Sequence, residues 1–215
     1  MKNKKIVLFS VVLLVIGFIA VAMFYQKGED KKTQQLASKS TGAPFVRDHS
    51  PIFGKNENKV TIVEFLDPEC SACRAFHPAI KKVFKEYSDE TQLVIRYLDN
   101  HKNSKFAIRL LEAARLQGKY EEALEIVFKY QPKWGDYNNP KPQLLWDVLP
   151  EAGLDMKKLR ADFDSNYIDG MLNIDRQDAT KLRVRGTPTF YVNGKELKKL
   201  SYQALLDLVE SEMYK

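Results

Sequence analysis

Two cysteines separated by two residues are the part of this sequence whose residue types and spacing are suited to chemistry. Cys70 and Cys73 form the stretch CSAC and are the only thiols among 215 residues. The apolar, β-branched run VTIVEFL at residues 60–66 precedes them, and apolar residues recur at helical spacing from Phe76 onward. The pattern therefore predicts that Cys70 lies between the end of a buried strand and the start of a helix over about residues 70–87.

A structural disulfide or a metal site is a poor use of this pair. A bridge that closes a loop of four residues restricts the unfolded chain little, by roughly 2 kcal/mol. The pair supplies only half of a tetrahedral zinc site, and His49, His77 and His101 lack the spacing that would supply the other half. His77 lies four residues after Cys73, which makes a weak metal site conceivable, but we interpret the three histidines as solvated or capping side chains.

Reversible dithiol exchange fits the position of the pair better. Unpaired N–H groups and the positive end of the helix dipole stabilise a thiolate at a helix start, which makes Cys70 both a nucleophile and a leaving group. Cys73, one turn further on and shielded, is placed to resolve a mixed disulfide. Glu64 in the apolar run is expected below the helix, where burial would raise its pKa and let it exchange a proton with Cys73. The alternative for Glu64 is a partly exposed side chain at the end of a strand.

The elements around the pair follow from the pattern further along the chain. A second strand is predicted at residues 92–98, and a helical tract at about 104–184 with breaks at Gly118, at 134–142 and at Gly153. Asp155 is expected to cap the helix that follows this last break, and Pro78 to bend the first helix. We interpret the aromatic side chains of the tract as core residues rather than the lining of a groove: Trp134, Tyr137 and Trp146.

The chain ends in a predicted hairpin and a last helix. Asn193-Gly194, the dipeptide that suits a two-residue turn, separates strands at residues 189–192 and 195–200. Ser201 is expected to cap the helix that closes the chain. The order of strand, helix, strand, helical block, hairpin and helix predicts an α/β fold with a helical insertion.

At this point the chain resembles the thioredoxin-fold thiol-disulfide oxidoreductases, and more closely their exported DsbA-like branch. The shared stretches are VTIVEFLDPEC, CSAC and VRGTPTFYVNG, with Pro78 eight residues after the first cysteine and helices inserted between strands. The resemblance implies a thioredoxin-like fold over residues 45–215. It also implies that Pro188 is a cis-proline, that Thr187 offers its backbone to an incoming peptide, and that Glu64 is the buried acid of the family. Ser71 and Ala72, between the cysteines, would tune the redox preference.

The N-terminus predicts export. Residues 6–25 carry no charge and are long enough as a helix to cross a bilayer core of about 30 Å, so we expect residues 1–25 to be a membrane anchor. A signal peptide cleaved after Ala22 is the competing interpretation. Residues 26–44 are polar and aperiodic, as in a flexible linker, and residues 45–215 remain for one domain.

Charge argues against a nucleic-acid partner. Residues 1–32 hold six lysines against two acidic residues, a surplus of four, which leaves two of the net charge of +6 for residues 33–215. So small an excess, spread over a domain, makes no basic groove.

These observations predict a thiol-disulfide oxidoreductase anchored by one span in a bacterial inner membrane, with its catalytic domain on the periplasmic or extracellular side. Its substrates would be exported polypeptides with thiols or disulfides, and a membrane redox partner would recycle the dithiol without a cofactor or a metal. Introducing disulfides is favoured over reducing or rearranging them, for example in cytochrome maturation. The rivals from other classes are a module that binds soft metals through the dithiol and a degenerate thioredoxin fold used as a scaffold.

Overall fold

A computed structural model describes residues 45–54, 60–165 and 167–214. The membrane anchor, the linker and the cleavage site after Ala22 that the sequence predicts therefore lie outside the described residues, in 1–44. Among the helices that the structure describes, none combines the length and the apolar composition that crossing a membrane requires.

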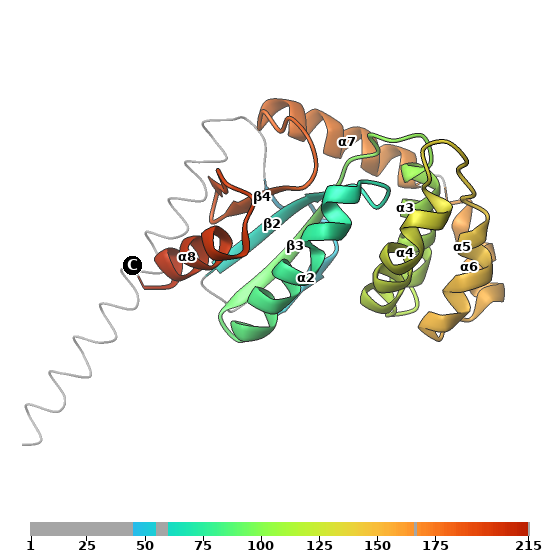
Figure 1. Cartoon of the computed structure of the whole chain (residues 1–215), viewed down its shortest axis with the longest axis horizontal. Coiled ribbons are helices and arrows are strands. Elements are labelled where there is room, and N and C mark those ends of the chain that lie inside the picture. Colours follow the sequence, from blue (N-terminus) through green and yellow to red (C-terminus); the bar gives the residue numbers. More distant parts are fainter. Residues whose placement is uncertain (1–44, 55–59, 166, 215) are drawn as a thin grey trace, which may run out of the picture.

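A five-stranded sheet in the order β1-β3-β2-β4-β5 forms the centre of the domain (Figure 1). Strand β2 (Val60–Leu66) runs parallel to β3 (Thr91–Tyr97) and antiparallel to β4 (Thr189–Val192), and all seven of its residues are buried. The two predicted strands at 60–66 and 92–98 are thus confirmed, the second within one residue. Strand β1 (Ile52–Phe53), antiparallel to β3, was not predicted, because two residues carry no periodic pattern.

The predicted hairpin is present, but its second strand is shorter than expected. Asn193 and Gly194 adopt positive φ angles of 47° and 81°, the left-handed conformation that this turn requires. Strand β5 (Lys195–Glu196) covers only two of the residues predicted at 195–200, because only the last two residues of the short strand β4 pair with it.

Helices cover both faces of the sheet. Helix α2 (Ser71–Glu86) contains Pro78 and packs beside α8 (Tyr202–Met213) on one face. Helix α7 (Tyr167–Lys181) contributes to the apolar cluster on the other face. The Ser201 hydroxyl accepts a hydrogen bond from the backbone N–H of Ala204, which confirms the predicted cap of the last helix.

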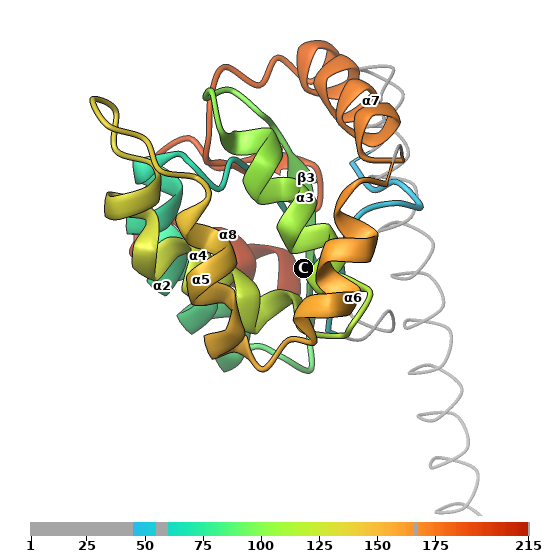
Figure 2. The same cartoon turned by 90° about the vertical axis from the view of Figure 1, so that its right-hand side faces the viewer.

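The inserted helices form a second packed unit beside the sheet, as Figures 1 and 2 show. Gly118 and Gly153 separate helices at φ angles of 67° and 73°, and Asp155 caps a helix through bonds from Lys157 and Lys158, as predicted. The inserted elements are α3 (Ser104–Arg115), α4 (Tyr120–Trp134), α5 (Leu144–Val148), a 3-10 turn η1 (Leu149–Ala152) and α6 (Met156–Phe163).

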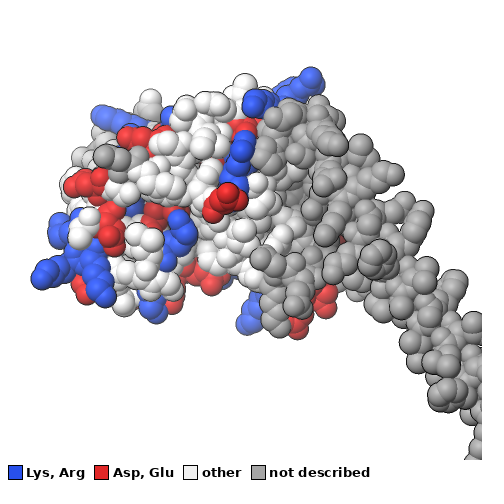
Figure 3. All heavy atoms as spheres, turned by 180° about the vertical axis from the view of Figure 1, so that it is seen from behind, with Lys and Arg blue, Asp and Glu red and all other residues white. Residues whose placement is uncertain are grey.

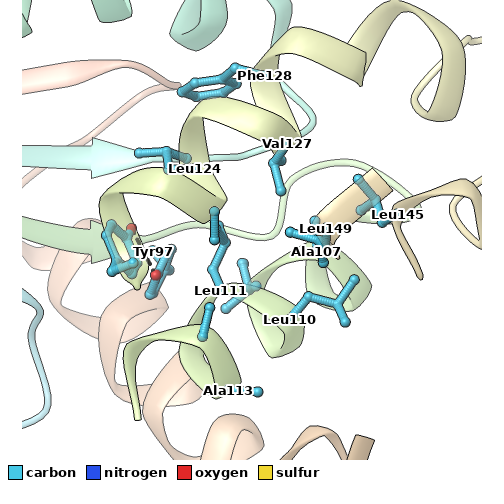
Figure 4. Close-up of a cluster of buried hydrophobic side chains, with 14 of the residues drawn as sticks. Tyr97, Ala107, Leu110, Leu111, Ala113, Leu124, Val127, Phe128, Leu145 and Leu149 are labelled. Atoms are coloured by element: carbon cyan, nitrogen blue, oxygen red, sulfur yellow. Dashed lines mark hydrogen bonds between the residues drawn. The ribbon is translucent and has the colours of Figure 1, made fainter. Parts of the chain in front are cut away.

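Apolar side chains from α3, α4, α5 and η1 meet in the core of this unit (Figure 4). The predicted core role is confirmed for Trp134, which is fully buried, and Trp146 packs against the edges of Phe106 and Phe163. It is wrong for Tyr137, whose side chain is 97% exposed because it stands in the loop between α4 and α5 rather than on a helix.

Acidic and basic side chains are interspersed over the coloured part of the face seen in Figure 3. The part of the chain described on that face therefore presents no continuous basic tract.

Candidate active site

Cys70 lies where β2 gives way to α2, as the sequence predicts. It is the N-cap residue of the helix, with φ −69° and ψ 120°, and its backbone N–H donates to the carbonyl oxygen of Asp67 at 3.1 Å. Its sulfur reaches the segment before β4, where the protonated thiol donates to the carbonyl oxygen of Thr187 at 3.2 Å. The Thr187–Pro188 peptide bond is cis, as the resemblance implied. The fold therefore joins two segments of the predicted site that are far apart in the sequence.

The two sulfurs have opposite environments. Both cysteines are free thiols; Cys70 is 8% exposed and Cys73 is fully buried. A hydrogen bond from the Cys73 side chain lowers the pKa of Cys70 to about 5. The Thr187 side chain and the backbone N–H groups of Cys73 and Ala72 lower this pKa further, whereas burial opposes them. Burial, with the same bond to Cys70, raises the pKa of Cys73 far above its ordinary value. At neutral pH one sulfur is ionised and the other holds its proton.

Glu64 is buried in the middle of β2, next to Ile95 on one neighbouring strand and Phe190 on the other. Glu64 is only 3% exposed, and this burial raises the pKa of its carboxyl group to about 8. The expectation of a buried acid is confirmed, and the alternative of a partly exposed glutamate is wrong. Glu64 also lines a partly enclosed pocket whose walls come from α2, α4 and the sheet, among them His77, Ile80, Ile95, Tyr120, Leu124 and Glu125.

The histidines differ from the prediction of solvated or capping side chains. Each contacts a carboxylate: His49 with Asp175 at 2.7 Å, His77 with Glu125 at 3.0 Å, and His101 with Asp67 at 2.7 Å. The prediction is wrong for His49 and His77, whose side chains are only 11% and 14% exposed. The fold packs each of them against an acid that is distant in the sequence. No three His, Cys, Asp or Glu side chains are grouped for a metal ion in the part of the chain that the structure describes.

Two acidic residues of the loop before Cys70 were missed by sequence reasoning. Asp67 accepts hydrogen bonds from the backbone of Asn100 at 3.0 Å and from the ring of His101. Glu69 accepts from the backbone and the side-chain amide of Asn103, at 2.6 and 2.8 Å. Their place in DPEC, directly before the cysteine, was the only local signal, because their partners lie more than thirty residues further on. The side chains of Ser71 and Ala72, in contrast, are exposed beside Cys70.

Comparison with known proteins agrees with this geometry. The profile of the family described as Thioredoxin matches residues 47–211. Disulfide bond formation protein D of Bacillus subtilis is 26% identical over 192 residues, which cover 86% of each chain. A Na(+)/H(+) antiporter NhaA of Herminiimonas arsenicoxydans is 31% identical over 157 residues, 73% of this chain, but the chain spans only about a quarter, 24%, of that protein.

Solved structures give the same result. The oxidised BdbD of Bacillus subtilis superposes with a TM-score of 0.68 at 25% identity, over 77% of this chain and 94% of that one. A thioredoxin-like oxidoreductase from Silicibacter pomeroyi superposes with a TM-score of 0.66 at 26% identity, over 78% and 94% of the two chains.

The fold and the site thus define a thioredoxin-fold protein with a dithiol at the start of a helix. The chain belongs to the thioredoxin family, and within it to the DsbA-like thioredoxin-fold oxidoreductases.

Proposed function

We propose that this protein exchanges disulfides with exported polypeptides, with Cys70 as the nucleophile and Cys73 as the resolving thiol. The observation that carries the proposal is the pair of opposite thiol environments at one helix start. The Cys70 sulfur, with its pKa of about 5, lies next to the Thr187 carbonyl, while Cys73 is fully buried. A thiolate with this pKa is almost fully populated at neutral pH and is a good leaving group.

In the oxidising direction the reaction begins with the Cys70–Cys73 disulfide. A substrate thiolate attacks the Cys70 sulfur, the disulfide breaks, and the electron pair leaves on the Cys73 sulfur, which then takes up a proton. A second substrate thiolate attacks the substrate sulfur of the mixed disulfide and releases Cys70 as a thiolate. The substrate has lost two electrons and gained a disulfide, and the protein has gained a dithiol. A membrane redox partner that accepts two electrons would return the pair to the disulfide.

Glu64 is the proton donor and acceptor for Cys73 in this proposal. With a pKa of about 8, its carboxyl holds a proton at neutral pH and can give it to the newly released thiolate, whose raised pKa favours the transfer. The pocket that Glu64 lines offers a way to restore that proton from solvent without passing the sulfurs.

Thr187 and Pro188 would hold the substrate chain. The Thr187 carbonyl oxygen is 3.2 Å from the Cys70 sulfur, so a peptide that pairs with this segment would be held beside the reacting atom. Ser71 and Ala72 would tune the redox preference through the surroundings of the same sulfur.

Oxidation of substrates is the direction that the low pKa of Cys70 favours, because a stable thiolate stabilises the reduced protein. Equilibration with glutathione tests this directly. We expect a potential well above that of a thioredoxin, which is about −270 mV. A potential near that value would refute the oxidase assignment and favour a reductase or isomerase.

The test of the exchange itself is to trap substrates. The variant Cys73→Ala leaves Cys70 able to attack but removes the thiol that resolves the mixed disulfide, so covalent adducts with exported proteins should accumulate. The double variant Cys70→Ala/Cys73→Ala is the control and should capture nothing. If Cys70 of the wild type resists alkylation at neutral pH, the proposed function is wrong.

We further propose that residues 1–25 anchor the protein in the bacterial inner membrane and that residues 26–44 tether residues 45–215 on the outer side. The name of the Bacillus subtilis relative, disulfide bond formation protein D, is consistent with export, because disulfides persist mainly in oxidising compartments outside the cytosol. Protease treatment of intact spheroplasts should digest the catalytic domain, while the N-terminal peptide stays with the membrane. A mature N-terminus at Met23 would instead show cleavage after Ala22.

A further inference from the structure

One glutamine of the inserted helices is bonded directly to the loop that carries the nucleophile. Gln131 lies in the last turn of α4 and is 4% exposed. Its side-chain amide nitrogen donates to the carbonyl oxygens of Pro68 at 2.9 Å and of Cys70 at 3.0 Å. Its side-chain oxygen accepts a hydrogen bond from the Nε atom of Arg74, on the first turn of α2, at 2.9 Å. Both hydrogens and the oxygen of one amide are thus used around Cys70.

A primary amide is the side-chain group that suits these three partners. Two carbonyl oxygens require two donors, and the guanidinium of Arg74 requires an acceptor. A carboxylate at position 131 would place negatively charged oxygens next to the two carbonyl oxygens, which would repel them. An apolar side chain would leave both carbonyls without this donor. The buried position adds to the cost, since a buried polar group without a partner costs about 1–3 kcal/mol.

The bond to the Cys70 carbonyl bears on the orientation of the sulfur. The peptide group that contains this carbonyl also fixes the ψ angle of Cys70, which is 120°, and hence the direction in which the first turn of α2 begins. The backbone N–H groups of Ala72 and Cys73, which stabilise the Cys70 thiolate, belong to that turn. The Cys70 carbonyl also accepts the first backbone hydrogen bond of the helix, from the N–H of Arg74 at 3.2 Å. Gln131 therefore adds a second donor that fixes the tilt of this peptide group, and its loss would let the group tilt and move those N–H groups relative to the sulfur.

We propose that Gln131 is a positioning residue for Cys70, through which the inserted helices hold the start of α2 in the orientation that stabilises the thiolate. The proposal rests on the proposed function of Cys70 as the nucleophile. It gives the inserted helices a part in the chemistry in addition to any part in shaping the substrate surface. Asp67 and Glu69 of the same loop accept hydrogen bonds from the segment that leads into α3.

The chain offers a matched control for this glutamine. Gln117, between α3 and α4, also uses both ends of its amide on backbone groups: it donates to the carbonyl of Asp155 at 3.1 Å and accepts from the N–H of Asp155 at 2.9 Å. Its partner starts α6 and not α2. Gln117→Met therefore removes a pair of amide–backbone bonds, more exposed than those of Gln131, from the inserted helices without touching the loop before Cys70.

The experiment compares Gln131→Met with Gln117→Met in the reduced full-length protein. The rate of alkylation by iodoacetamide as a function of pH reports the ionisation of Cys70, and equilibration with glutathione reports the redox preference. For Gln131→Met we expect the ionisation midpoint to rise by about one pH unit, a tenfold loss in thiolate stabilisation. The equilibrium with glutathione should shift by a similar factor toward the oxidised protein, while Gln117→Met changes neither measurement by as much as twofold.

A second variant covers the case in which Gln131→Met does not fold. Arg74 is exposed, so Arg74→Lys keeps the positive charge and removes only the bond that orients the Gln131 amide. A smaller rise of the midpoint in the same direction is expected. If the variants that fold ionise as the wild type does, Gln131 is only an interface contact and the proposal is wrong. A wild-type midpoint near 8.5, in contrast, would refute the proposed function itself.

Discussion

Lowering the pH from 7 to 4 is expected to remove a stability contribution that only the reduced protein has. In the folded reduced protein the pKa of Cys70 is about 5, whereas a thiol in an unfolded chain has a pKa of about 8.5. A pKa that is lower in the folded state stabilises the fold above that pKa, and the contribution is lost as the pH falls through 5. Two pH units separate 5 from 7, and at 1.36 kcal/mol each they correspond to about 2.7 kcal/mol. Cys73 adds nothing here, because its thiol stays protonated in both states.

Urea unfolding of the oxidised and the reduced protein at pH 4, 5, 6 and 7 measures this contribution. The free energy of unfolding of the reduced protein minus that of the oxidised protein should rise by about 2.7 kcal/mol between pH 4 and pH 7, nearly all of it above pH 5. Reduced Cys70→Ala should lack this dependence. A difference between the two redox forms that does not change with pH would refute the reasoning, because it would mean that Cys70 ionises as an ordinary thiol.

Three other substitutions test the surroundings of the site. Glu64→Gln should stabilise the protein by up to about 3 kcal/mol at pH 7, as measured by thermal unfolding. The pKa of this buried acid is raised to about 8, so the wild-type fold becomes less stable as the pH rises above the pKa of glutamate in the unfolded chain. The gain from the substitution should therefore vanish near pH 4. The same variant, with Cys73 intact, should slow the resolution of mixed disulfides by Cys73, because that thiol then lacks its proton acceptor. Arg96→Met leaves Asp175 and Asp178 buried without its guanidinium and should cost about 3–5 kcal/mol in urea unfolding. Asp155→Ala removes the cap of α6 and should cost only about 1 kcal/mol in the same assay.

Features decided by neighbours within a few residues could be predicted from the sequence. The turn at Asn193-Gly194, the cap at Asp155 and the place of Cys70 at a helix start all depend on local backbone preferences, and the structure agrees with each. The buried position of Glu64 followed from the apolar residues on both sides of it in one strand. Such features need no knowledge of the tertiary fold.

Features decided by distant partners could not be predicted. Gln131 bonds to the carbonyl of a residue 61 positions away, and nothing in its own helix distinguishes it from an exposed glutamine. The acids that contact His49 and His77 likewise come from other parts of the chain. Strand β5 was predicted too long because its length depends on how much of β4 remains to pair with it.

The order of the strands has a consequence for the newly made protein. The carbonyl that meets the Cys70 sulfur belongs to Thr187, 117 residues later in the chain, and β4 follows it. A polypeptide emerging from the ribosome or through a membrane pore therefore presents CSAC well before the segment that covers it has been delivered. Until that segment arrives, the two cysteines are uncovered and can react with any oxidant or thiol nearby. They can therefore be oxidised or reduced by other molecules before the assembled site can exchange disulfides itself.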